Sequence, residues 1–502
     1  MNNKKALKKN LFSNIMVFFL NGVIGFWLPP YLIKTLGIGA YGIIPLATTI
    51  IGYAALVTVG INGSLSRFLA IDLADGRKEE ANYTFNTALA SLSSLLIFLL
   101  PLLIIFSFNI ESFISLPEGM EKDASRLFIC VSVAFILTSL TAVFNTSAYV
   151  ANRLDLVNRV TVINTGVRVL LVVVIYLFIK VSLSGYGWAV LTASIFSSAY
   201  SFYLFRKFTP FIKINPFRIR RSSLSKLLSM GGWLIVIQLG SILFLQIDLL
   251  VINKVLGNVA AGKYSVILQW STMIRQFSTS LSGALGPLIL TLFAQKETQR
   301  MIEISKLSNK VLTLFITCTV GVLCIISGNL LSLWINPKFA DLKWLFIAVL
   351  LPLPINLGVQ PLFSVNRAFN KVRVPGIFTC SMGVLNLLLA IFFVKYTDLK
   401  LYGVAIASGI VLTLKNFIFM PLYVASNMKI NRFTFFRSSL SSVGLLAFAM
   451  VLTFVYPMVF KLNTWFTLFL HSGLLFGFFG GLSYLLLNRA EKDIVFKMIR
   501  KR

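Results

Sequence analysis

Charged side chains are scarce in this sequence, and acidic ones are the scarcest. Only 12% of its 502 residues are charged, 57% are hydrophobic, and the mean hydropathy is +0.86. A soluble domain carries about twice that share of charge, so the composition excludes an ordinary soluble protein. A lipid-facing surface can hold this much apolar area. The sequence therefore predicts an integral membrane protein.

Residues that usually carry catalysis or bind metals are also few. His471 is the single histidine, and the four cysteines lie in apolar stretches without the paired spacing of a metal site. The sequence contains no HExxH, P-loop, GxGxxG or GxSxG motif. No loop is long enough to hold a nucleotide-binding domain, which argues against an ATP-driven pump. We therefore expect no metal, no cofactor and no enzymatic activity.

Charged residues divide the sequence into apolar blocks. Each block has about 20 residues or more, the length that a membrane-spanning helix needs. Ten blocks contain no charged residue, and four of similar length contain one charge each. The first block follows four lysines, but it is too long for the apolar region of a signal peptide. The fourteen predicted helices lie within 10–33, 35–66, 81–110, 127–152, 160–179, 181–205, 227–253, 264–295, 311–337, 344–366, 374–394, 401–428, 438–460 and 462–488.

Basic residues are distributed unevenly between the predicted loops. With the N-terminus inside, the cytoplasmic segments hold 32 lysines and arginines, whereas the opposite loops hold 11. Such a bias sets the orientation of membrane proteins, so we expect both termini in the cytoplasm. The net charge of +30 is then a topology signal, and we expect no nucleic-acid partner. Six of the seven tryptophans, Trp334 among them, lie near predicted helix ends, as in an interfacial belt.

A weak internal repeat runs through the sequence. Three pairs of segments match in the same order, at offsets of 220, 214 and 216 residues. Both copies start inside, so the repeat is parallel, and such lobes usually hold the substrate between them and expose it on alternate sides. The matching pairs are TLGIGAYG at 35–42 with VLGNVAAG at 255–262, NRLDLVNRV at 152–160 with NRAFNKVRV at 366–374, and YGWAVLTAS at 186–194 with YGVAIASG at 402–409.

The repeat predicts the domain organisation. Residues 1–210 form an N-lobe of six helices, and 228–428 form a C-lobe of six more. A basic cytoplasmic linker at 211–227 joins them, and 429–502 add two helices and a cytoplasmic tail. The predicted fold is an all-α membrane protein of about fourteen helices, with two parallel six-helix lobes around a central cavity.

Arg275 is the first functional candidate among the charges inside predicted helices. A charge at the bilayer centre costs about 2.5–3.5 kcal/mol, so such residues are usually functional. Arg275 lies about 18 Å from the outer end of its predicted helix, too deep to reach either surface easily. Gln269 and Gln276 share its polar face, and Trp270 lies beside it. This face suits either a substrate cavity or a hydrogen-bond network between helices, and Trp270 either a sugar-stacking or a core role.

Three more charges lie inside predicted helices. Asp248 shares a predicted face with Gln238, and the repeat maps this face onto one that contains Asn21, so both faces are predicted to line one central space. As the only acidic residue there, Asp248 is a candidate site for a coupling ion, although it could instead cap or pair with a neighbour. Arg168 lies two turns from a predicted helix end, where its side chain could reach the surface. The role of Lys415 stays open.

Several segments resemble the polysaccharide transporter, or O-antigen flippase (Wzx-type), family of the multidrug/oligosaccharidyl-lipid/polysaccharide exporter superfamily. The resemblance covers nearly the whole chain, and its patterns are diffuse rather than catalytic. The segments that carry it are YLIKTLGIGAYGI at 31–43, SRFLA at 66–70, ANRLDLVNRV at 151–160, and QIDLLVINKVLG with AGKYSV at 246–266.

The resemblance implies a bacterial inner-membrane protein that carries undecaprenyl-diphosphate-linked oligosaccharide in a cationic cavity. Arg275 fits such a cavity because an arginine can grip a phosphate with two hydrogen bonds. The implied partners are this substrate, membrane lipids and other polysaccharide-assembly proteins. The expected substrate-binding residues are Arg275, Gln269, Gln276, Trp270, Asn21, Gln238 and Lys415, with Asn145, Tyr149, Asn356 and Gln360 as further candidates on the implied cavity helices.

Two other functions fit parts of the pattern. A drug or cation antiporter of the same superfamily usually carries several cavity acids, whereas this sequence has one acid against up to three bases inside the predicted helices. A glycan polymerase or ligase generally needs a large outer loop with catalytic residues, and the predicted outer loops are short. The sequence therefore favours a flippase that works by alternating access from the cytoplasmic to the outer leaflet.

Overall fold

The fold of this chain is known from a computed structural model. The described residues form helices and turns without a β-strand, so the predicted all-α class is confirmed. The predicted C-terminal tail from 493 onward lies outside them. The structure describes residues 3–151, 153–215, 217–283, 285–369, 371, 373–436, 440, 442–489 and 491–492.

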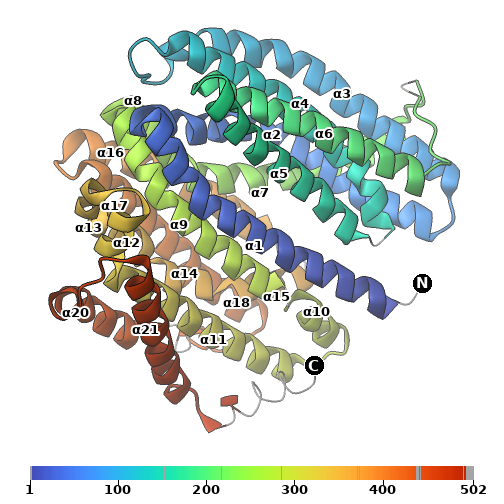
Figure 1. Ribbon diagram of the computed structural model, residues 1–502. Helices are drawn as coiled ribbons and strands as arrows, with labels where there is room; N and C mark the ends of the chain where they lie inside the picture. The colour runs from blue at the N-terminus through green and yellow to red at the C-terminus, as the bar shows by residue number, and fades with distance from the viewer. Residues whose placement is uncertain are drawn as a thin grey trace. The chain divides into compact units, whose positions relative to one another are not determined.

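By its internal contacts the chain divides into two compact units, Met1–Ser265 and Val266–Arg502. The first unit consists of long helices joined by loops (Figure 1). Its elements are α1 (Asn3–Leu36), α2 (Ile38–Ala74), α3 (Lys78–Phe108), the short 3-10 helix η1 (Ile110–Ser112), α4 (Glu121–Val150), α5 (Leu154–Phe178), α6 (Leu183–Phe208), α7 (Arg221–Leu245) and α8 (Ile247–Leu256).

Helix α9 (Asn258–Gly283) begins in the first unit and continues into the second. The second unit has shorter and more interrupted helices than the first. Its further elements are α10 (Gly286–Ala294), α11 (Thr298–Ile325), α12 (Ser327–Trp334), η2 (Pro337–Leu342), α13 (Lys343–Leu350), α14 (Leu353–Gly358), α15 (Gln360–Ala368), α16 (Arg373–Tyr396), α17 (Lys400–Leu412), the π-helical segment η3 (Thr413–Phe419), α18 (Met420–Asn427), α20 (Val443–Val459) and α21 (Trp465–Leu485).

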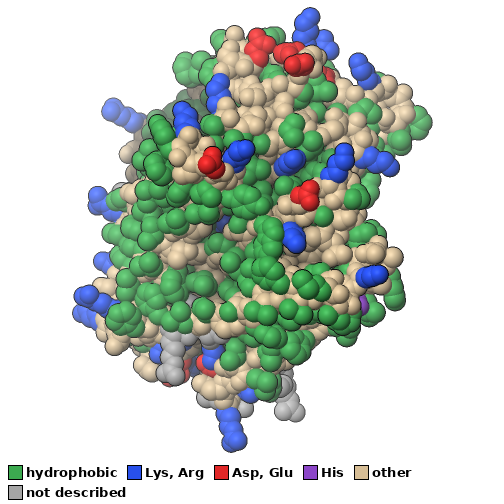
Figure 2. Space-filling view, turned by 90° about the vertical axis from the view of Figure 1, so that its left-hand side faces the viewer, with side chains coloured by type: hydrophobic (Ala, Val, Ile, Leu, Met, Phe, Trp, Pro, Cys, Tyr) green, Lys and Arg blue, Asp and Glu red, His purple; other side chains and the backbone are tan. Residues whose placement is uncertain are grey.

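Each of the fourteen predicted blocks contains helix. Within the described part of the chain, eleven helices are long and apolar enough to cross a membrane. This confirms a polytopic membrane protein, while the exact count of fourteen stays a prediction. Large side chains such as Phe12, Phe98 and Phe178 are exposed, and Figure 2 shows a broadly hydrophobic face, as a surface that meets lipid requires.

Four blocks that were predicted as single helices are broken into two or more. Pro354 and Pro361 stand in the first turns of α14 and α15, because a proline lacks the N–H group that would continue the preceding helix. By contrast, α1 runs through Pro29 and Pro30 to Leu36. The broken blocks are 227–253, 264–295, 311–337 and 344–366.

The core of the first unit lies where α2, α3, α4 and α6 meet. Helix α4 packs against α3 and α6, and the three lie side by side in Figure 1. Phe85 of α3 and Phe205 of α6 are fully buried, with stacked rings 4.7 Å apart. Helix α7 packs against α2 and α3, which places it in the first unit. The predicted lobes, with their linker at 211–227, stay a prediction.

The predicted basic linker is fastened to α3. The buried amide of Asn86 donates to the backbone oxygen of Lys213 at 2.9 Å and accepts from the backbone N–H of Asn215 at 2.7 Å. Arg220 forms an ion pair with Glu80 at the start of α3. The linker therefore follows a defined path rather than acting as a loose tether.

Replacing Asn86 with alanine is expected to lower the free energy of unfolding by about 1–3 kcal/mol, because two linker groups lose their partner. Trypsin should then cut the linker faster at Lys213. The matched control is Asn109→Ala, because the exposed Asn109 amide bonds only to its own helix. Unchanged melting temperature and unchanged tryptic cleavage would show that Asn86 does not hold the linker.

The two copies of the first repeated motif have the same backbone form. Gly37 joins α1 to α2 at φ 84° and ψ 160°, and Gly257 joins α8 to α9 at φ 88° and ψ 175°. This conformation is essentially restricted to glycine. Helices α2 and α9 then meet at Gly42 and Gly262, where a Cβ added to Gly42 would lie 2.7 Å from the backbone nitrogen of Gly262. The wider repeat of two lobes stays a prediction.

The second unit is organised around α11, against which α14, α15, α20 and α21 pack. Helix α14 approaches so closely that a Cβ added to Gly358 would overlap the side chain of Thr313. A buried cluster that includes Leu362 of α15 and Met420 of α18 extends this core. These contacts hold α14 against α11, and α15 against α18, the helix that follows η3.

Candidate functional site

Arg275 lies deep within α9. It follows the first residue of the helix, Asn258, by roughly 26 Å at 1.5 Å per residue. Its Nε atom donates a hydrogen bond to Ser271 Oγ at 3.2 Å, and Thr279 Oγ1 donates to its backbone oxygen at 2.8 Å. The side chain is half-buried, whereas Ser271 is fully buried. The neighbouring turn therefore positions the guanidinium group.

Lys415 lies in the π-helical segment Thr413–Phe419, between α17 and α18. Such turns are rare and frequently occur at functional sites. The charge of Arg275 acts on Lys415, so the two cations lie in the same part of the second unit. The Nζ atom of Lys415 lies 6.0 Å from the ring centre of Phe363 on α15. The structure thus joins Lys415, whose role the sequence left open, to Arg275.

Amide side chains bond to threonines that neighbour these cations in the sequence. Asn356 donates to Thr413 Oγ1 at 3.1 Å, and Gln360 donates to Thr279 Oγ1 at 3.4 Å, which links α15 to α9. The buried Oδ1 atoms of Asn356 and Asn416 accept no hydrogen bond from other described residues. An unsatisfied buried acceptor costs about 1–3 kcal/mol, a cost that functional sites commonly carry.

Two like charges in one apolar region repel each other, and an anion bound between them removes that repulsion. Arg275 offers a planar fork of donors, and Lys415 offers a compact positive charge. Phosphate and carboxylate groups suit such a pair, because charge-assisted hydrogen bonds are about twice as strong as neutral ones. The charges of Arg275 and Lys415 are therefore suited to binding an anion.

The other α9 candidates differ in their surroundings. Gln276 is exposed, and Gln269 is half-buried. Trp270 packs edge-on against Trp334, with ring centroids 5.3 Å apart, and against Phe346 at 6.0 Å. Trp334 is only 4% exposed, so it lies in the core of the second unit rather than in an interfacial belt. The aromatic cluster favours a packing role for Trp270 over stacking on a sugar.

Asp248 belongs to the first unit and opens α8. Because α7 ends at Leu245, Asp248 does not share one continuous helix with Gln238, and the predicted common face is wrong in this respect. Asp248 is 4% exposed and accepts a hydrogen bond from the Tyr264 hydroxyl at 3.4 Å. Its charge also acts on Tyr53 of α2. A carboxylate in the first turn of a helix is stabilised by the helix dipole.

The four remaining candidates belong to the first unit. Asn21 is exposed on α1 and Gln238 is half-buried on α7, and among the described residues no hydrogen bond joins either to another candidate. Asn145 accepts a hydrogen bond from Ser201 Oγ at 2.8 Å, which is a contact between α4 and α6. Tyr149 is 53% exposed. Their roles in binding substrate stay predictions.

Arg168 lies deeper than the sequence predicted. Helix α5 begins at Leu154, so Arg168 is about 21 Å from that end rather than two turns. The side chain is half-buried, and its Nε atom has no hydrogen-bond partner among the described residues. The Arg168 side chain therefore reaches the surface less easily than expected. The sequence prediction began this helix at residue 160, after the charged Arg159, and so placed its start too late.

The sequence missed the partners that organise the cation pair. Ser271 precedes Arg275 by one helical turn, a spacing that brings two side chains together. Thr413 and Asn416 flank Lys415, but hydropathy alone does not reveal a π-helical segment. A cluster of polar residues around a lysine inside an apolar block is the signal that could have drawn attention to them.

Sequence comparisons match the chain to one protein family and to individual relatives. A family model described as "Polysaccharide biosynthesis protein" matches residues 7–293. The chain is 28% identical to the "Uncharacterized membrane protein EpsK" of Bacillus subtilis, over 98% of both chains. It is 23% identical to the "Putative O-antigen transporter" of Shigella flexneri, over 83% of this chain and 98% of the relative.

A solved structure shares the fold over nearly the full length. It is the lipid II flippase MurJ in an inward closed conformation, with a TM-score of 0.69 and 16% identity. The alignment covers 97% of this chain and 100% of MurJ. At this identity the likeness establishes a common fold.

Proposed function

Because this chain belongs to the polysaccharide biosynthesis protein family, we propose that it is a flippase for undecaprenyl-diphosphate-linked oligosaccharide. The cargo moves from the cytoplasmic to the outer leaflet of a bacterial inner membrane. A transporter rather than an enzyme agrees with the names of its relatives and with the fold that it shares with MurJ. The family resemblance stated from the sequence is therefore confirmed.

The pair formed by Arg275 and Lys415 is the observation that carries this proposal. A lipid-linked diphosphate brings negative charge to membrane depth, where unpaired charge is costly. Lys415 lies within Lys400–Asn427, a helix long and apolar enough to cross a membrane, and the positive charges of Lys415 and Arg275 match that charge. A cationic drug would be repelled by the same pair, so these residues do not favour a drug antiporter.

In the proposed cycle, the diphosphate binds at Arg275 and Lys415, and the sugars lie along polar side chains. Gln269 and Gln276 of α9 can donate to and accept from sugar hydroxyls. Alternating access then releases the headgroup on the outer side while the lipid tail stays in the bilayer. Other polysaccharide-assembly proteins are proposed to supply and consume this cargo.

Export of surface polysaccharide in a deletion strain tests the function. Without the gene, lipid-linked glycan should accumulate in the cytoplasmic leaflet, and expression of the full chain should restore its exposure outside. The measurement is the fraction of lipid-linked glycan accessible to a membrane-impermeant label on spheroplasts. Intact export in a strain that lacks redundant transporters would contradict the proposal and favour another cargo.

We propose that Asp248 binds the coupling proton or sodium ion. In Asp248→Asn the side chain can still accept the hydrogen bond from Tyr264, but it cannot ionise. Transport driven by an ion gradient should therefore slow by about 5- to 150-fold, the usual range of coupling between sites, and the protein should stay folded. Flipping in proteoliposomes with and without an imposed gradient measures the effect.

The matched control is Glu118→Gln, because Glu118 is an exposed acidic residue in a loop. This variant should respond to the gradient as the wild type does. Gradient-driven transport at the wild-type rate in Asp248→Asn would assign Asp248 a structural role at the start of α8.

A further inference from the structure

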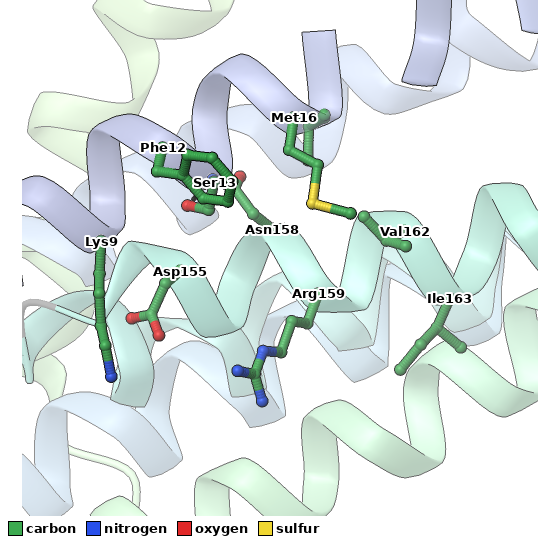
Figure 3. Close-up of a pocket in the computed structure, with 10 residues that line it drawn as sticks. Lys9, Phe12, Ser13, Met16, Asp155, Asn158, Arg159, Val162 and Ile163 are labelled. Atoms are coloured by element: carbon green, nitrogen blue, oxygen red, sulfur yellow. Dashed lines mark hydrogen bonds between the residues drawn. The ribbon is translucent and has the colours of Figure 1, made fainter. Parts of the chain in front are cut away.

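A groove lies between α1 and α5 in the first unit, near the N-terminal ends of both helices (Figure 3). Its volume of about 670 Å³ lies within the roughly 300–1,000 Å³ that is typical of small-molecule sites. Cationic, polar and apolar side chains line it in separate zones. The anion site around Arg275 and Lys415 uses none of these residues.

Polar side chains hold the two walls of the groove together. The backbone N–H of Asp155 donates to Asn10 Oδ1 at 3.0 Å. Asn158 donates to Ser13 Oγ at 2.8 Å and to Asn14 Oδ1 at 2.6 Å. These contacts join residues that are about 145 positions apart in the sequence, so tertiary structure creates the groove and keeps its walls in register.

The mouth of the groove is positively charged. Lys9 and Arg159 are exposed and point the same way in Figure 3, with Asp155 between them. Arg153 binds both carboxylate oxygens of Asp155, at 2.8 and 3.0 Å. Within the described residues, neither Lys9 nor Arg159 forms an ion pair. Two cations thus face one carboxylate that already has its own arginine.

The apolar zone lies deeper along both helices. Phe12 and Met16 follow Lys9 by one and two turns on α1, and Val162 and Ile163 follow Arg159 on α5. In Figure 3 the Met16 thioether points toward Val162. Phe12 and Met16 are 71% and 53% exposed, which is costly in water but not beside hydrocarbon. A charged mouth above apolar walls is the profile of a lipid in one leaflet.

We propose that this groove binds one anionic glycerophospholipid of the bilayer. Its phosphodiester lies between Lys9 and Arg159, and one hydrocarbon chain runs along Phe12, Met16 and Val162. The positive end of α5 adds to the attraction, because α5 begins at Leu154, just before the mouth. The site is separate from the cargo site and does not depend on the identity of the cargo.

The charges of the mouth favour an anionic lipid headgroup. Because Arg153 already pairs with the Asp155 carboxylate, the charges of Lys9 and Arg159 are left to attract a lipid phosphate. Ser13 of α1 and Asn158 of α5 also line the groove, and they can bond to the hydroxyls of a glycerol headgroup.

Native mass spectrometry of the full-length protein tests the site. The protein is released from nanodiscs of phosphatidylcholine with a minority of phosphatidylglycerol, and the lipids that stay bound are counted. The wild type should retain phosphatidylglycerol in preference to phosphatidylcholine. The double variant Lys9→Gln/Arg159→Gln should retain at least about tenfold less, because two charge-assisted hydrogen bonds are lost.

Two matched variants separate the groove from general surface charge. Arg206→Gln/Lys207→Gln removes two exposed cations at the end of α6, outside the groove, and should leave retention unchanged. Val162→Trp should fill the groove and reduce retention while all charges remain. An equal loss in the α6 variant, or full retention in Val162→Trp, would overturn the proposal.

A competition arm distinguishes the two phosphate-bearing lipids. Undecaprenyl phosphate is added to nanodiscs that contain phosphatidylglycerol, and the lipid adducts of the wild type and of Lys9→Gln/Arg159→Gln are compared. Continued preference for phosphatidylglycerol supports the proposal. Preferential binding of undecaprenyl phosphate, lost in the double variant, would assign the groove to the cargo and contradict a bilayer-lipid site.

Discussion

Replacing Arg275 with alanine is expected to reduce flipping of the lipid-linked glycan by at least about 100-fold. The guanidinium group can make two charge-assisted hydrogen bonds to a diphosphate, each worth about 1.5–3 kcal/mol, and each 1.36 kcal/mol corresponds to about a tenfold change in rate. The fraction of glycan exposed on the outer leaflet measures the loss. Membrane levels of the variant, compared by immunoblot, show whether the protein is made.

Three variants separate a substrate contact from a structural network. Arg275→Gln can keep the hydrogen bond to Ser271 but carries no charge, and Arg275→Lys keeps the charge but loses the planar fork. We expect the glutamine variant to be inactive and the lysine variant to keep partial activity. Lys306→Ala removes an exposed cation of α11 and should transport normally. Wild-type transport by Arg275→Gln would show that the residue serves packing between helices.

A double-mutant comparison tests whether Arg275 and Lys415 act on the same anion. If both bind one diphosphate, the loss in Arg275→Ala/Lys415→Ala should be smaller than the product of the two single losses, because the first substitution already removes much of the shared site. Losses that simply multiply would place Lys415 outside that site. The same flipping assay provides all four rates.

The second large effect is expected at the crossing of α2 and α9. A Cβ added at Gly262 would overlap the backbone oxygen of Ile38, and backbone atoms cannot move aside as flexible side chains do. Gly262→Ala should therefore lower the free energy of unfolding by about 1–3 kcal/mol, and Gly262→Val by more. The melting temperature of the purified protein and its amount in the membrane measure the change.

The matched control lies on the same helix. Nothing lies within 4 Å of a Cβ added at Gly283, so Gly283→Ala should be neutral, or stabilising by up to about 1 kcal/mol, because alanine favours the helix. Gly42→Ala should resemble Gly262→Ala, since the two glycines face each other. An unchanged melting temperature in both Gly42→Ala and Gly262→Ala would show that the crossing can open without cost.

The class of this protein follows from its sequence because a bilayer imposes a simple length and charge rule on each segment. The apolar blocks had to span about 30 Å of hydrocarbon, and every block contains helix. The repeated glycine motif was also visible in the sequence, and its two glycines, Gly37 and Gly257, occupy the same restricted conformation. Each of these features is local, and local pattern is what hydropathy and spacing report.

Boundaries and breaks were less predictable, because hydrogen bonds and packing decide where a helix ends. The sequence treated 227–253 as one helix, but the chain turns at Gln246, which moves Asp248 into the first turn of α8. Helix α5 begins before the apolar block does, so Arg168 lies near its middle. A prediction that ends each helix at a charged residue misses a first turn that contains polar or charged residues.

By itself the sequence determined the all-α membrane class, the family and the candidates Arg275 and Asp248, since each rests on residues close in the chain. Only the tertiary structure brought Lys415 to Arg275, 140 positions away, and placed Lys9 and Arg159 on one groove. Such pairs depend on which helix faces pack together. Helix packing is a property of shape in three dimensions, and the order of residues along one helix does not specify it.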